Sequence, residues 1–286
     1  METILQYLID VLLATLTHLT ILLAPIMFLG LIMHLISQQI EKLTVGIIGM
    51  PGYLYLFGWI GTAVHELGHL IFALLFGHQI SNVKLFSFNA SNPQQGYVKH
   101  NFNKKNIYQN LGNFFIGIGP ILLGGSALFI IGYLIFDLKF NDIVISNLKL
   151  SDLSITESIF QVFSSIYDGL MSTIKAIANQ ENAAWWKYLL FFYLLFSIGS
   201  AISLSQSDIK GSFSGLLLFI ALILLLNLST LWAGNFVTVL FTKISGLFSG
   251  FYLMLLLSIV FNLGFLLLLW LISSLMPIKK EKKKTN

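Results

Sequence analysis

Long apolar runs constrain this chain more than any other feature of its sequence. A helix of about 20 apolar residues crosses a hydrocarbon core of roughly 30 Å, and runs of this kind recur along the chain. Hydrophobic residues make up 56% of the 286 positions and charged residues only 10%. That balance is far from the composition of a water-soluble globular domain. The sequence therefore predicts an all-α polytopic membrane protein.

We expect about six transmembrane helices within a single integral-membrane domain that spans residues 1–278. The expected spans lie at 4–36, 53–77, 111–136, 184–205, 213–232 and 247–276. A basic tail, 279–286, follows the last span. Because five lysines of the tail adjoin an apolar helix, we interpret it as a cytoplasmic membrane-surface anchor, not a nucleic-acid site.

The distribution of lysine predicts the topology. The chain has no arginine, and a cytoplasmic tail with six spans places both termini in the cytoplasm. Segment 78–110, which carries four lysines, then lies on the cytoplasmic side. Segment 137–183, which is rich in Asp and Glu, lies on the outer side. We accordingly expect a multi-pass protein of the cell membrane.

Two connecting segments are expected to carry structure. Apolar residues recur at helical spacing in 155–177, which predicts an amphipathic helix on the outer membrane interface. Segment 79–101 instead contains two short β-type runs, 83–88 and 96–100, with Asn-Ala-Ser-Asn-Pro between them. This pattern predicts a small membrane-associated β-hairpin.

The motif His65-Glu66-Leu67-Gly68-His69 lies inside the second apolar run. Residues i and i+4 share one helix face, so both imidazoles can bind one zinc ion while Glu66 acts as general base. Six histidines and six glutamates in this chain give a chance expectation of about 0.003 such motifs. A buried carboxylate between two imidazoles is also an expensive way to hold helices together. A zinc site is therefore the favoured interpretation.

A catalytic zinc usually has three protein ligands and an open fourth position. The chain has no cysteine, so the third ligand must be His, Asp or Glu. Asp208 is the best candidate, because it is the acidic residue near membrane depth in the second half of the chain. An ordinary turn residue paired with Lys210 is the alternative interpretation. His78 and His100 are the other candidate ligands.

These motifs resemble the site-2 protease family of intramembrane zinc metalloproteases over about residues 53–215. The resemblance rests on His65–His69, on the hairpin that follows and on Gly119-Pro120 in the next span. It implies that Zn²⁺ is held by His65, His69 and Asp208. The chain differs from well-known members in having Ile209 where they have glycine. It also has Leu123 where they often have asparagine, which leaves Asn113 or Asn110 as polar supports for the substrate.

The expected function is hydrolysis of peptide bonds within or near transmembrane segments of membrane-anchored proteins. Glu66 is the expected catalytic residue of this zinc-dependent metalloendopeptidase. A non-catalytic zinc-binding membrane protein, such as a transporter or an assembly factor, is the alternative. Transporters commonly repeat their helical pattern in two halves, and this sequence shows no such repeat.

Overall fold

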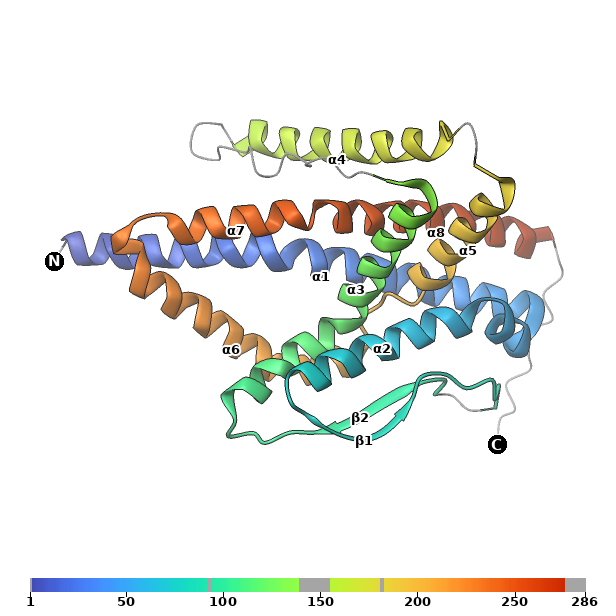
Figure 1. The fold of residues 1–286 in the computed structure, drawn as a ribbon, viewed down its shortest axis with the longest axis horizontal. Coiled ribbons are helices and arrows are strands. Elements are labelled where there is room, and N and C mark those ends of the chain that lie inside the picture. The colour runs from blue at the N-terminus through green and yellow to red at the C-terminus, as the bar shows by residue number, and fades with distance from the viewer. Residues whose placement is uncertain (1, 92–93, 139–154, 181–182, 276–286) are drawn as a thin grey trace.

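The computed structural model describes residues 2–91, 94–138, 155–180 and 183–275 (Figure 1). The basic tail and much of the expected outer segment lie outside the described residues. The fold is mostly helical, with one two-stranded sheet. Its elements are α1 (Glu2–Tyr53), η1 (Leu54–Gly58), α2 (Trp59–Leu75), β1 (Gln79–Lys84), β2 (Tyr97–Asn101), α3 (Ile107–Phe136), α4 (Ile155–Ala178), α5 (Trp185–Gly199), α6 (Gln206–Thr230), η2 (Leu231–Ala233), α7 (Phe236–Leu247) and α8 (Ser249–Leu275).

The first helical run folds back on itself. Helices α1 and α2, with the π-helical turn η1 between them, form the 73-residue run Thr3–Leu75. At 1.5 Å per residue such a run would be about 110 Å long if straight, far more than a bilayer. The turn occurs at Gly49, whose φ of 75° and ψ of 164° are non-helical. Residues with a side chain rarely adopt this conformation, which explains glycine there.

Four described helical runs are long and apolar enough to cross a membrane, which supports a multi-pass membrane protein. These runs are Thr3–Leu75, Ile107–Phe136, Gln206–Ala233 and Ser249–Leu275. The expected number of six spans is not confirmed. The count falls to four because α1 and α2 join in one run and because α5 has only 15 residues.

Helix α3 lies at the centre of the fold and contacts α2, α5, α6 and α8. Its glycines let neighbouring backbones approach closely. A Cβ added at Gly68 of α2 would lie 2.7 Å from the Gly119 carbonyl group, and one added at Gly117 would lie 2.9 Å from the Asp208 carbonyl oxygen. These two contacts, only two residues apart on α3, bring the His-Glu-x-x-His helix and the start of α6 close to the same part of α3.

The predicted β-hairpin is confirmed. Strands β1 and β2 pair antiparallel, with an irregularity between Ile80 and Asn82. The first strand ends at Lys84, earlier than expected. Beyond it, Phe88 stacks on Tyr55 of η1 with ring centroids 4.7 Å apart. The hairpin therefore runs along α2 with its tip at the N-terminal end of that helix, as Figure 1 shows, and does not stand away from the helices.

Helix α4 forms where the amphipathic pattern predicts a helix, and it contacts α8 and runs alongside it (Figure 1). Thr173 and Ile177 are buried on its inner face, whereas Phe163 and Tyr167 are exposed. The amphipathic pattern thus places one face on the helical core and leaves aromatic side chains on the other.

Candidate metal centre

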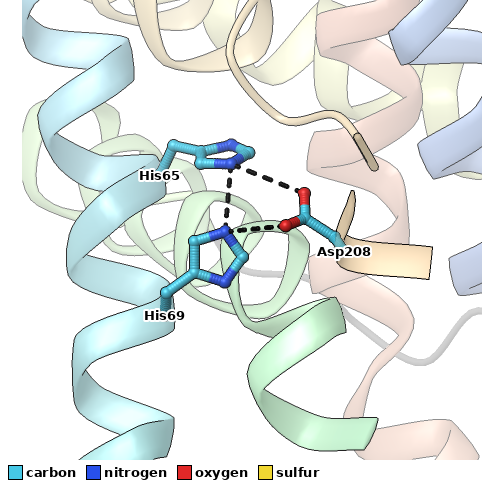
Figure 2. Close-up of side chains that lie close together, drawn as sticks. All are labelled: His65, His69 and Asp208. Atoms are coloured by element: carbon cyan, nitrogen blue, oxygen red, sulfur yellow. Dashed lines mark hydrogen bonds and ion pairs between the residues drawn. The ribbon is translucent and has the colours of Figure 1, made fainter. Parts of the chain in front are cut away.

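Three predicted ligands from two helices meet at one point, as Figure 2 shows. His65 and His69 come from α2, and Asp208 comes from the first turn of α6. The two Nε2 atoms lie 3.2 Å apart. Asp208 Oδ1 lies 3.4 Å from His69 Nε2, and Asp208 Oδ2 lies 3.9 Å from His65 Nε2. One ligand atom from each residue lies within 4.8 Å of the other two.

Backbone carbonyl groups orient both imidazoles. His65 Nδ1 lies 2.8 Å from the Ala201 carbonyl oxygen, and His69 Nδ1 lies 2.8 Å from the Ile116 carbonyl oxygen. A carbonyl oxygen only accepts, so each Nδ1 carries the hydrogen and donates it. Each Nε2 is then left with a lone pair directed at the other ligands. This arrangement, with Nδ1 donating to a fixed acceptor, is usual for histidines that bind metals.

The start of α6 fixes Asp208. The Ser205 N–H donates to Asp208 Oδ2 at 2.9 Å, and the Asp208 N–H donates to Ser205 Oγ at 3.1 Å, which makes a reciprocal capping box. No ion pair with Lys210 is found among the described residues, whose ion pairs with Asp208 both involve histidine. The alternative interpretation of a turn residue paired with Lys210 is therefore not supported.

The donor set fits a small divalent metal. With neutral imidazoles, two nitrogen lone pairs and a carboxylate converge, and a metal cation between them would offset their repulsion. Zinc binds His and carboxylate at about 2.0–2.2 Å, so tetrahedral ligands lie roughly 3.3 Å apart. The separations of 3.2 Å between the two Nε2 atoms and of 3.4 Å between His69 Nε2 and Asp208 Oδ1 are close to this value, while the other oxygen of Asp208 lies 3.9 Å from His65 Nε2.

Glu66 lies beside the metal ligands and is covered by the hairpin. Its side chain is only 9% exposed. A Cβ added at Gly96, just before β2, would lie 2.6 Å from Glu66 Cγ and 3.1 Å from Glu66 Oε1. Any larger residue at position 96 would therefore displace the carboxylate. Gly96 is a site residue that the motif alone does not predict.

Two cavities adjoin the cluster formed by His65, His69 and Asp208, each on a different side. The smaller, of about 130 Å³, is lined by His69 and Asp208 together with polar groups of α3 and α6. The larger, of about 420 Å³, is lined by His65 and Glu66. Pockets that take drug-sized ligands usually have volumes of roughly 300–1,000 Å³. The larger cavity, on the Glu66 side, is therefore the one with room for part of a polypeptide.

His78 and His100, the other candidate ligands, do not join the cluster. They form their own pair, with Nδ1 atoms 2.9 Å apart, and His78 Nε2 donates to the Gln109 carbonyl oxygen at 2.8 Å. Burial lowers the pKa of His100, and the nearby His78 and His69 lower it further. The pair links β2 to the ends of α2 and α3. His100 also lines the smaller cavity, so it lies near the cluster without being part of it.

Of the two predicted polar supports for the substrate, Asn113 lines a cavity beside the metal ligands and Asn110 does not. Asn113 is buried, lines the smaller cavity and donates from Nδ2 to both Asn110 Oδ1 and Ser214 Oγ at 3.3 Å. Asn110 does not line either cavity. Sequence reasoning missed the carbonyl acceptors at Ala201 and Ile116, for which the sequence carries no signal. The spacing Ser205-x-x-Asp208, by contrast, is a signal that identifies the capping box.

No protein-family model matches the chain, and comparisons with curated proteins and with solved structures found no match either. Function is therefore inferred below from the cluster and its surroundings.

Proposed function

We propose that this protein is an intramembrane zinc metalloendopeptidase of the site-2 protease type. One observation carries the proposal: three oriented ligands converge, and Glu66 lies next to one of them on the same helix. A metal site used only for binding or transport has no need of a buried carboxylate in that position. The combination instead provides both the metal ligands and the general base that peptide hydrolysis requires.

Bound zinc would act as a Lewis acid toward the scissile carbonyl and lower the pKa of a coordinated water toward about 7. The residues of the chain perform the remaining tasks. His65, His69 and Asp208 hold the ion, and the carbonyl groups of Ala201 and Ile116 keep the imidazoles in the required tautomer. Glu66 accepts the proton of the attacking water and returns it to the leaving amine. No covalent intermediate with the protein is needed.

The proposed substrate is a membrane-anchored protein. A transmembrane helix hides its peptide bonds, so it must unwind before attack, and its freed N–H and C=O groups then need partners. The β-hairpin lies along α2 beside Glu66 and has strand edges that α2 does not pair. An unwound segment added to one of these edges regains main-chain hydrogen bonds next to the cluster.

The proposed topology has six spans. Helices α1 and α2 cross as separate spans joined by the turn at Gly49. The other four spans are α3, α5, α6 and α8, which pack together. Charge counts place both termini in the cytoplasm, although the start of α1 and the end of α8 lie at opposite ends of the longest axis in Figure 1. The hairpin enters the membrane from the cytoplasmic end of α2. Non-helical backbone is tolerated at that depth because the hairpin covers a polar cavity.

The proposal is tested with purified, zinc-loaded protein in detergent and a mixture of synthetic peptides whose products are identified by mass spectrometry. The wild type should hold about one zinc per chain and cleave peptides. Glu66→Gln keeps the size of the side chain but removes the base, so zinc should remain while the rate falls by about 10² to 10⁴. Undiminished cleavage by Glu66→Gln would contradict the mechanism. Zinc binding without any cleavage would favour the non-catalytic alternative.

A further inference from the structure

The larger cavity has a wall that the catalytic residues do not account for. Helix α1 lines it with four polar residues at spacing i, i+3, i+4 and i+7: His34, Ser37, Gln38 and Glu41. This spacing places all four on one helix face. Across the cavity lie Thr62, His65 and Glu66, which are at i, i+3 and i+4 on α2. Two polar helix faces therefore oppose each other over the site.

Four polar residues of this part of α1 line the cavity, whereas the polar residues Gln39 and Lys42 lie outside its lining. Leu31 and Leu35, which lie on another face of the same turns, are exposed. Within the polar face, His34 Nε2 and Gln38 Nε2 are 2.9 Å apart and form a hydrogen bond. We call His34, Ser37, Gln38 and Glu41 the polar stripe of α1. A helix that merely crossed a membrane beside the site would not need this stripe. Polar residues at membrane depth usually mark a binding or transport path.

The stripe gives the cavity a negative charge. Glu41 and Glu66 both line it, and none of the described residues that line it is a lysine. Lys42 follows Glu41 directly but is not among the lining residues. No ion pair of Glu41 is found among the described residues. Glu41 is exposed, whereas Glu66 is buried beside the metal ligands.

We infer that the larger cavity binds an extended stretch of substrate carrying a lysine or arginine side chain, and that Glu41 selects this residue. The inference rests on the proposed function. A cationic side chain entering the cavity would pair with Glu41, which lines it and has no ion pair among the described residues. Arginine or lysine at such a point also suits a membrane-anchored substrate, because basic residues commonly flank transmembrane helices.

The dimensions limit where the basic residue lies. Glu41 lies seven positions after His34 on α1, which is about 10 Å along a helix. An extended chain covers about 3.3 Å per residue, so the stripe matches about three residues of substrate. The basic residue should therefore occur at one fixed position relative to the cleaved bond, always on the same side of it.

The peptide mixture used above tests this inference when its cleavage sites are aligned. Wild-type protein should favour lysine or arginine over glutamine at one position near the bond by about three- to fivefold, as expected for a partly exposed ion pair. Glu41→Gln should abolish this preference without changing the zinc content. Glu41→Lys should replace it with a preference for Asp or Glu. Lys42→Gln, the matched control on the next helix face, should retain the wild-type pattern.

The outcomes distinguish the inference from the proposed function. Cleavage by wild-type protein with no basic preference overturns the inference alone. A basic preference that survives in Glu41→Gln shows that another residue selects it and overturns the role of Glu41. Absence of cleavage by zinc-loaded wild-type protein overturns the proposed function, and the inference with it. Zinc content and elution as a single species in detergent verify that each variant is folded.

Discussion

Asp208 has two functions that substitutions can separate. Its carboxylate caps α6 through Ser205, and it also faces the two histidines. Asp208→Ala removes the cap and the ligand together. Asp208→Asn retains an oxygen that can accept from the Ser205 N–H but loses the negative charge. Ser205→Ala leaves Asp208 in place and removes only the hydroxyl that accepts from its N–H.

The expected losses of zinc affinity follow from these contacts. Partners that orient a ligand typically contribute 10- to 100-fold in metal affinity, and Ser205→Ala should lose no more than about tenfold because it keeps the Ser205 N–H that donates to the carboxylate. Asp208→Ala removes the ligand itself and should lose more than 100-fold, which corresponds to more than about 2.7 kcal/mol. Asp208→Asn should fall between the two. Loss of the cap alone should cost only about 1 kcal/mol of stability.

A chelator competition series measures these affinities, and the visible spectrum of the Co²⁺-substituted protein reports the geometry of the site. Thermal unfolding of the same samples separates loss of the cap from loss of the ligand. Wild-type zinc affinity in Asp208→Ala would refute the ligand assignment. His78 and His100 would then be tested, although their pairing makes them poor substitutes.

Three shorter predictions concern the rest of the site. His65→Ala and His69→Ala should each lose zinc, measured as metal content after gel filtration, because two-ligand sites are weak. The chain has no cysteine, so single-cysteine variants report topology: Lys104→Cys at the hairpin base should react with an impermeant maleimide from the cytoplasmic side, whereas Asn89→Cys near the tip should be protected. Gly96→Ala should displace Glu66 and lower the cleavage rate by at least tenfold with zinc retained, and an unchanged rate would contradict the close contact.

The sequence predicts those parts of the structure that depend on short-range spacing. The interval between His65 and His69 fixes one helix face, so their convergence follows from the motif. The alternating pattern of 79–101 identifies a hairpin in the same way. Asp208 is a harder case, because its approach to α2 depends on α3 packing closely against both helices, through Gly68 of α2 and through its own Gly117. The resemblance to a family suggested this contact, but spacing alone could not.

Other features depend on packing that local patterns do not encode. Charge counts place the hairpin on one side of the membrane but do not show that its tip reaches Tyr55. The number of spans is also hard to predict from local patterns. Hydropathy identifies apolar length, whereas the turn at Gly49 depends on one backbone conformation within a continuous helical run.

Electrostatics within the cluster lead to a last prediction, on the stability of the protein without metal. Asp208 lies close enough to Glu66 to repel it, and both side chains are largely withdrawn from water. A bound divalent cation would offset this repulsion, so removal of zinc should destabilise the fold beyond the loss of ligand contacts. Zinc at about 100 times its dissociation constant stabilises the native state by about 2.7 kcal/mol. Chelation should therefore lower the midpoint of thermal unfolding measured by tryptophan fluorescence in detergent. Glu66→Gln removes one of the two like charges, so it should unfold at a higher temperature than wild type after chelation and at a similar temperature with zinc bound. An equal midpoint for the two proteins after chelation would show that the carboxylates do not interact, and the case for a metal between the histidines and Asp208 would then rest on the positions of the ligands alone.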